Sequence, residues 1–100
     1  MRLKIHFIIK HSNLKITKKI KEEIRIKFDR NKYQVKISES GFKGETKNLA
    51  KEAVLNKTDL IVACGGDGTI NEILNEIKRR GFKIAIIPIG SGNGIARHFN

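Results

Sequence analysis

The chain has 100 residues, with 21 lysines and arginines against 10 aspartates and glutamates, one cysteine and no tryptophan. This length allows one domain with a small core. A single cysteine excludes an internal disulfide framework and a multi-thiolate zinc site. No apolar stretch is long enough to cross a membrane, and the first residues lack the apolar segment of a signal peptide, so we expect a cytoplasmic protein.

The net charge of +11 is concentrated in the first half, because residues 1–57 carry 16 of the cations and only 6 of the acids. A basic half-domain suits nucleic acid, an anionic membrane or a phosphorylated ligand. Most of the cations are lysines spread along predicted helices beside isoleucine and asparagine. A general drift in composition therefore explains the same excess without any ligand.

The first predicted strand spans residues 5–9, a short run of apolar and mostly β-branched residues. Residues 13–28 predict a helix, because apolar residues recur every four positions while lysine fills most of the other face. Ile26 falls outside that apolar stripe. Asn31 and Lys32 mark a turn before the next strand.

A second strand is predicted from residue 33, where apolar and polar residues alternate as they do when one face is exposed. Residues 41–44 form a loop, and the helix after it has an apolar face made of Leu49, Ala50, Ala53 and Val54. Residues 60–64 are uniformly apolar, which indicates a strand covered on both faces. Residues 84–87 predict a fourth strand that stops at Pro88, and Ile95, Ala96 and Phe99 begin a fourth helix.

The third helix shows start and stop signals. Thr69 with Glu72 three residues later matches a capping box, which places the helix start at Thr69. Lys78 and the two arginines after it suit the last turn, and Gly81 ends the helix.

The alternation of strands and helices predicts an α/β fold with three layers, a parallel sheet and right-handed crossovers. The alternating second strand belongs at an edge and the uniformly apolar third strand at the centre. A strand order of 2-1-3-4 satisfies both conditions.

Two glycine-rich turns, residues 65–69 and 90–94, follow the third and fourth strands and lead directly into helices. Ligands of open parallel sheets bind at the carboxyl ends of the strands. Glycine lets the backbone approach a ligand, and a helix N-terminus attracts anions. The pair predicts a cradle for a polyphosphate, although each could also be an ordinary tight turn.

Asp67 is the candidate catalytic residue. A carboxylate among phosphate-binding amides repels phosphate unless a cation or a reacting hydroxyl lies between them. Asp67 could therefore orient a water on Mg²⁺ or accept a proton from a substrate hydroxyl, or it could simply cap the helix. Thr69 could offer its hydroxyl to a phosphate, and Asn71 is near enough to touch a ligand. The Walker A pattern is absent.

The three histidines and the single cysteine predict no metal site. His6 and Cys64 lie within apolar strands, so we expect both to be structural. His11 and Ser12 follow the first strand and could face the ligand. Arg97, next to His98, could approach a phosphate from the last helix.

Residues 65–72, GGDGTINE, resemble the GGDGT-N-E signature of the diacylglycerol kinase catalytic-domain family, which includes bacterial lipid kinases and the sphingosine kinases. Residues 87–97 resemble that family's P-x-G-[TS]-x-N-x-x-A-R segment. Residues 44–50 resemble its G-H-A…L-A helix start, with Glu45 and Thr46 in place of histidine and alanine.

The resemblance implies a phosphofructokinase-like domain, similar to the N-terminal domain of NAD kinases, that uses ATP and Mg²⁺ to phosphorylate a lipid hydroxyl. It implies a catalytic role for Asp67 and no direct metal ligand. Carried over by position, the nucleotide-binding residues are Ser40, Gly65, Gly66, Asp67, Gly68, Thr69, Ile70, Asn71, Glu72, Ser91 and Asn93.

Family members are much longer and carry a second, β-rich domain, and this chain has residues 10–13 where they usually have N-P-x-S-G. We therefore expect an N-terminal piece of a lipid kinase, inactive alone, that meets its lipid at a membrane surface in the full-length form and binds no nucleic acid. Its unfinished sheet edge invites pairing with a second copy. Two alternatives remain open: an NAD-kinase-like enzyme, and a basic non-catalytic module for nucleic acid or membrane.

Overall fold

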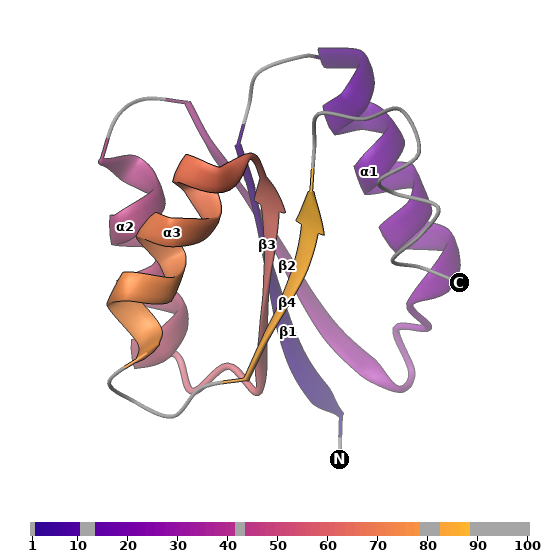
Figure 1. Cartoon of the computed structure of the whole chain (residues 1–100). Helices are drawn as coiled ribbons and strands as arrows, with labels where there is room; N and C mark the ends of the chain where they lie inside the picture. The colour runs from indigo at the N-terminus through magenta and orange to yellow at the C-terminus, as the bar shows by residue number, and fades with distance from the viewer. Residues whose placement is uncertain (1, 11–13, 42–43, 79–82, 89–100) are drawn as a thin grey trace.

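The computed structural model describes residues 2–10, 14–41, 44–78 and 83–88. Strands and helices alternate along these residues (Figure 1): β1 (Leu3–Lys10), α1 (Leu14–Lys27), β2 (Tyr33–Ser40), α2 (Glu45–Leu55), β3 (Leu60–Gly65), α3 (Asp67–Ile77) and β4 (Lys83–Pro88). Each corresponds to an element predicted from the sequence. The predicted fourth helix lies outside the described residues.

The four strands form one parallel sheet in the order β2-β1-β3-β4, as predicted. In its register, Ile5 of β1 lies opposite Val35 of β2 on one side and Leu60 of β3 on the other. Figure 1 shows α1 on one face of the sheet and α2 with α3 on the other. The chain therefore has the expected three-layer α/β/α architecture.

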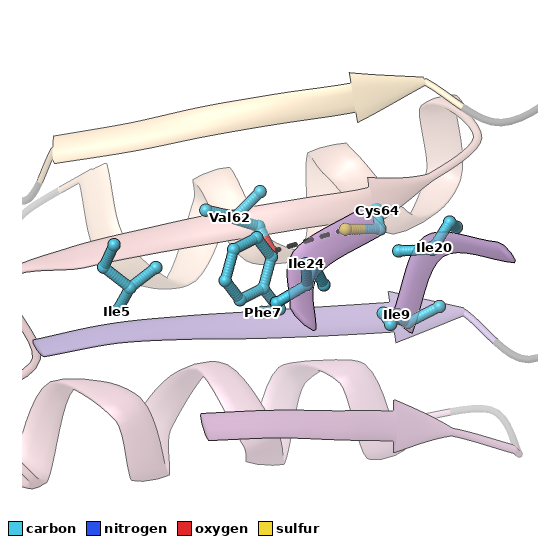
Figure 2. Close-up of a cluster of buried hydrophobic side chains, with 7 residues drawn as sticks. All are labelled: Ile5, Phe7, Ile9, Ile20, Ile24, Val62 and Cys64. Carbon is cyan, nitrogen blue, oxygen red and sulfur yellow. Dashed lines mark hydrogen bonds between the residues drawn. The ribbon is translucent and has the colours of Figure 1, made fainter. Parts of the chain in front are cut away.

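One core cluster fills the space between α1 and the sheet (Figure 2). It is formed by alternate residues of the central strands and by the isoleucine stripe of α1: Ile5, Phe7, Ile9, Ile20, Ile24, Val62 and Cys64, all buried. Phe28 packs at the end of the cluster near the start of β2. Its ring meets those of Phe7 and Tyr33 edge to face, with ring centroids 5.2 and 5.3 Å apart. Ile26, outside the stripe, is 64% exposed as its position predicts.

A second core cluster lies between the opposite face of the sheet and α2 with α3. Its members are Ile8, Ala50, Ala53, Ile61, Ala63, Ile73 and Ile77. Both faces of β1 and β3 are thus covered, which explains why these strands are uniformly apolar. None of the helices within the described ranges is long and apolar enough to cross a membrane.

The ends of α3 differ from the prediction. The helix begins at Asp67, with Gly66 in extended conformation as its N-cap and no side-chain cap, so the predicted capping box of Thr69 and Glu72 does not form. An early start is favourable because an acidic residue in the first turn complements the helix dipole. The helix ends at Ile77, so Lys78 is its C-cap residue and not part of its last turn. The two arginines predicted for the last turn and the predicted stop at Gly81 lie outside the described residues.

Helix α2 ends in a Schellman motif that uses a lysine instead of a glycine. The N–H of Thr58 donates to the carbonyl of Ala53 at 3.2 Å, and that of Lys57 to the carbonyl of Val54 at 3.1 Å. Lys57 has a φ of 56°, the left-handed conformation that favours glycine. The chain therefore stores some backbone strain at the amino-terminal side of β3.

Candidate functional site: the glycine-rich turn between β3 and α3

The predicted phosphate cradle is the turn where β3 passes into α3. Gly66 is extended, with φ −84° and ψ −174°, and its carbonyl accepts the first helical hydrogen bond from the N–H of Ile70 at 3.1 Å. No side chain among the described residues caps this end. The N–H groups of the first turn therefore point out of the helix end without an intrahelical partner, and the positive end of the dipole is open to an anion.

The glycines of this turn divide into two kinds. A Cβ at Gly65 would lie 2.8 Å from the Cβ of Thr69, so packing requires glycine there. A Cβ at Gly66 or Gly68 would have no heavy atom within 4 Å, and neither residue has a positive φ. Neither packing nor backbone conformation in the described part of the chain therefore requires glycine at these two positions. Their missing side chains leave the backbone open to approach from outside.

The polar side chains predicted for the site stand on its exposed side. Asp67, Asn71 and Glu72 are all exposed, and Asp67 forms no ion pair within the described segments. Thr69 is only 8% exposed and packs against Gly65, while Ile70 is half-buried against the second core cluster. Asp67 and Asn71 are thus available to a ligand, whereas the Thr69 side chain mainly holds the turn together.

Ser40 ends β2 at the same edge of the sheet, with β1 between β2 and β3. Its side chain is fully buried, and its hydroxyl shares a hydrogen bond of 2.6 Å with that of Thr46. Nearby, the N–H of Gly41 donates to the Glu45 carboxylate at 2.6 Å. Contact between the Ser40 hydroxyl and a nucleotide would therefore require a rearrangement of this turn. Sequence analysis missed the pairing with Thr46.

The second glycine-rich turn, with Ser91 and Asn93, lies outside the described residues, as do His11, Ser12, Arg97 and His98. The end of β4 is nonetheless informative, because Pro88 lies opposite Gly65 in the sheet register. The chain therefore leaves β4 directly beside the glycine-rich turn of β3.

His6 and Cys64 are both buried, as their place in apolar strands predicts. Burial raises the pKa of the Cys64 thiol to about 12, so the group remains protonated. Burial, assisted by the positive charge of Lys36, lowers the pKa of His6 to about 4, and its Nε2 lies 2.7 Å from the Ser38 hydroxyl. The part of the chain that the structure describes holds no cluster of three metal-ligating side chains.

Comparison with known proteins assigns the family. The family model of the diacylglycerol kinase catalytic domain matches residues 4–100. A diacylglycerol kinase of Bacillus subtilis strain 168 is 36% identical over 88 residues, which cover 86% of this chain and 29% of that protein. A sphingosine kinase of Arabidopsis thaliana is 30% identical over 99 residues, covering 91% of this chain and 20% of that protein.

A solved structure shows the same fold. The crystal structure of a diacylglycerol kinase from Bacillus anthracis aligns with a TM-score of 0.67 at 24% identity, over 92% of this chain and 34% of that one. The alignment with the Bacillus subtilis relative likewise covers only part of that protein, so the chain spans less than a third of its length. Because the family model matches nearly every residue, including the glycine-rich turn, the chain belongs to the diacylglycerol kinase catalytic domain family.

Proposed function

We propose that the turn from Gly65 to Glu72 binds the phosphates of ATP with Mg²⁺, and that the chain is the nucleotide-binding part of a lipid kinase. The acceptor would be a hydroxyl of a lipid that resembles diacylglycerol or sphingosine. The names of the relatives support a lipid acceptor and make an NAD-kinase-like activity the weaker choice. In the full-length form the lipid would be met at the membrane surface from the cytoplasm.

The observation that carries the nucleotide proposal is the open space above Gly66 and Gly68 at the uncapped start of α3. Backbone N–H groups at such a helix start can donate to phosphate oxygens, and a side chain at either position would stand in the way. Nothing in the packing of the described residues explains these two glycines. A polyphosphate lying against the turn does.

Bound ATP would supply the phosphoryl group for transfer. The chain's own contribution begins with the first-turn N–H groups, which would fix the phosphates, and with the exposed Asn71 and Glu72, which flank them. Asp67 has one of two roles: it orients a water bound to Mg²⁺, or it accepts the proton of the lipid hydroxyl. Ser91 and Asn93 are expected to complete the cradle from the β4 side.

The chain alone should bind nucleotide without phosphorylating lipid. Phosphoryl transfer requires a positioned nucleotide, a metal and a positioned, activated hydroxyl. Of the two exposed carboxylates at the turn, Asp67 and Glu72, only Asp67 stands in the first turn of α3. The large apolar side chains of the described residues mostly cover the sheet. Lipid contacts are expected from the second domain that the longer relatives contain.

Titration of the isotope-labelled protein with Mg²⁺–ATP, followed by amide NMR, tests the binding site. We expect saturable shifts at Gly66, Gly68 and Asn71. Binding should be weaker in Gly68→Ala but not in Asn75→Ala, an exposed residue about two turns further along α3. Shifts confined to the lysines of α1 and α2, with the turn unmoved, would refute the nucleotide site.

A chimaera tests the lipid kinase activity. The chain would replace the matching 88 residues of the Bacillus subtilis diacylglycerol kinase. Transfer of labelled phosphate from ATP to diacylglycerol or sphingosine is expected, with none above background for the unfused chain. A folded chimaera that binds ATP but phosphorylates neither lipid would contradict the proposed acceptor class.

A further inference from the structure

A pocket lies at the opposite edge of the sheet from the glycine-rich turn. It has a volume of about 260 Å³ and is lined by the amino-terminal halves of β1 and β2 and by the segment that follows α2. Its polar lining residues are Lys4, His6, Gln34, Lys36, Asn56 and Thr58. The volume lies just below the range of ordinary small-molecule sites, which suits a compact ligand.

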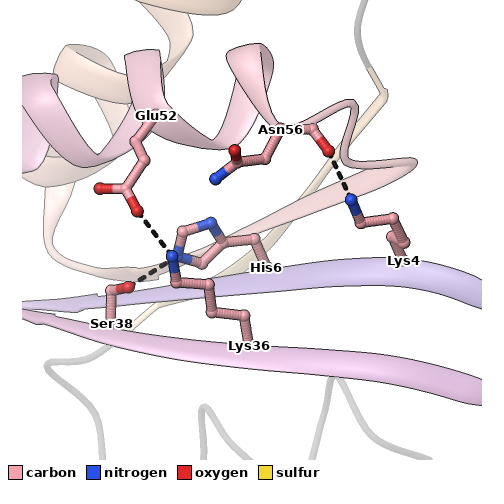
Figure 3. A network of polar contacts seen from close by, with 6 residues as sticks. All are labelled: Lys4, His6, Lys36, Ser38, Glu52 and Asn56. Carbon is pink, nitrogen blue, oxygen red and sulfur yellow. Dashed lines mark hydrogen bonds and ion pairs between the residues drawn. The ribbon is translucent and has the colours of Figure 1, made fainter.

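Donors dominate the pocket lining (Figure 3). The Lys4 ammonium donates to the backbone carbonyl of Asn56 at 2.5 Å, and the Lys36 ammonium pairs with the Glu52 carboxylate at 2.6 Å. An ammonium has three N–H donors, so each of these lysines keeps donors to spare. No aspartate or glutamate is among the residues that line the pocket. Two carboxylates lie next to these lysines without lining the pocket: Glu52 pairs with Lys36, and Asp59 accepts from the backbone N–H of Lys4 at 2.7 Å. The lining itself therefore carries only positive charge.

His6 forms the buried floor of this pocket, with 1% of its surface exposed. Its Nε2 is bonded to Ser38, but its Nδ1 has no hydrogen-bond partner among the described residues. Every fully buried side-chain nitrogen or oxygen of the described residues has a hydrogen-bond partner. Because Nδ1 has none, this atom is not fully buried and keeps a small accessible surface beside the pocket that His6 lines. When the Ser38 hydroxyl donates to Nε2, Nδ1 carries the proton and becomes a donor aimed at a ligand.

From these donors we propose that the pocket is an anion site that holds one phosphate group, either free phosphate or the phosphate of a small phosphomonoester. Lys4 and Lys36 would supply the charge, since each can approach the anion without losing its present partner. His6 Nδ1 and the Asn56 and Gln34 amides would provide directed hydrogen bonds. The site is separate from the proposed nucleotide turn, because it lies at the amino ends of the strands, where Ile5 is opposite Leu60.

Titration of the labelled protein with inorganic phosphate at constant ionic strength tests this proposal. We expect saturable amide shifts at residues 4–6, 34–36 and 56–58, and a change in the imidazole resonances of His6. Lys4→Gln and Lys36→Gln should each weaken binding at least about tenfold. Lys18→Gln is the matched control, because it removes one exposed positive charge on α1 and should leave the affinity unchanged.

Methyl phosphate distinguishes the two sources of the anion. If methyl phosphate binds more tightly than inorganic phosphate, the pocket is a phosphomonoester site. If inorganic phosphate binds more tightly, the pocket is a site for the free ion. The proposal is overturned if chloride at equal ionic strength produces the same shifts. It is also overturned if Lys18→Gln weakens binding as much as Lys36→Gln does, since the anion would then be responding to net charge alone.

Discussion

Thr69 lies directly over Gly65, so that a Cβ placed at residue 65 would come within 2.8 Å of the Cβ of Thr69 and 2.9 Å of its hydroxyl oxygen. This close approach allows the last residue of β3 and the first turn of α3 to pack without a gap. It also fixes where the open N-terminus of α3 stands relative to the sheet. The neighbouring Gly66 and Gly68 have no such contact.

Gly65→Ala should destabilise the protein by about 1–3 kcal/mol, because Thr69 or the turn must move to make room for the new methyl group. Urea unfolding followed by circular dichroism measures the change. The double variant Gly65→Ala with Thr69→Ser removes one of the clashing methyl groups and should recover part of the loss. A single variant as stable as the parent chain would show that the contact is softer than the geometry indicates.

Gly68→Ala should have the opposite effect on stability and a separate effect on binding. Alanine in the first turn of α3 meets no other atom within 4 Å, so it should stabilise the helix by about 0.5–1 kcal/mol. The same methyl group would stand where the phosphates are proposed to lie, so we expect clearly weaker Mg²⁺–ATP binding in calorimetry. Unchanged affinity would place the nucleotide elsewhere.

Asp67→Asn should separate the charge of this residue from its structural role. Loss of a carboxylate near the phosphates should raise the affinity for metal-free ATP by about threefold to tenfold. It should also remove much of the increase in ATP affinity that Mg²⁺ provides. Turnover of the chimaera should fall at least about a hundredfold. Glu76→Gln, which removes an acid from the last turn of α3, is the control. A folded Asp67→Asn variant with normal turnover would exclude both proposed roles.

Lys57→Gly should stabilise the protein by about 0.5–1 kcal/mol, since glycine adopts the left-handed conformation without the steric penalty of a side chain. The φ of 56° at Lys57 is the basis of this expectation. Lys57→Ala removes the same charge but retains the penalty, so it should change stability little. Thermal unfolding of the three proteins at one ionic strength makes the comparison, and equal melting temperatures for all three would count against it.

Acidification should destabilise the protein through His6. Its pKa is lowered from 6.5 to about 4 by burial and by Lys36, with Glu52 acting in the opposite direction. The unfolded chain therefore binds the extra proton more readily, and stability declines as the pH falls from about 6.5 to 4. Allowing for solvent contact, this effect amounts to about 1–2 kcal/mol. Unfolding free energies of the parent and His6→Gln proteins across this range should converge at low pH, and parallel curves would contradict the assignment.

The fold could be predicted because its signals are local and mutually consistent. Alternation in β2, a uniformly apolar β3 and the isoleucine stripe of α1 each follow from which faces the element buries. The strand order followed from two of these patterns together. The glycine-rich turn was found for a similar reason, since its residues are adjacent in sequence and its place at a strand end follows from the topology.

The details that escaped prediction depend on contacts between residues distant in sequence or on competing local choices. The pairing of Ser40 with Thr46 needs the exact path of the turn between them. The pocket around His6 brings together two strands and the end of α2, which no sequence pattern joins. The capping box at Thr69 was a valid local signal, but the contact with Gly65 draws Thr69 into the packed turn and starts the helix earlier.

The parallel pairing of β1 with β3 also bears on synthesis of the chain. Ile5 meets Leu60, so β1 cannot gain its second neighbour until 55 further residues have been made. Parallel strands cannot be joined by a short hairpin, and the long connections between them make strand pairing slow. Until β3 emerges, the apolar side chains of β1 have only α1, β2 and α2 for cover. A nascent chain arrested before Leu60 should therefore be prone to aggregation, and one arrested well after Gly65 should not.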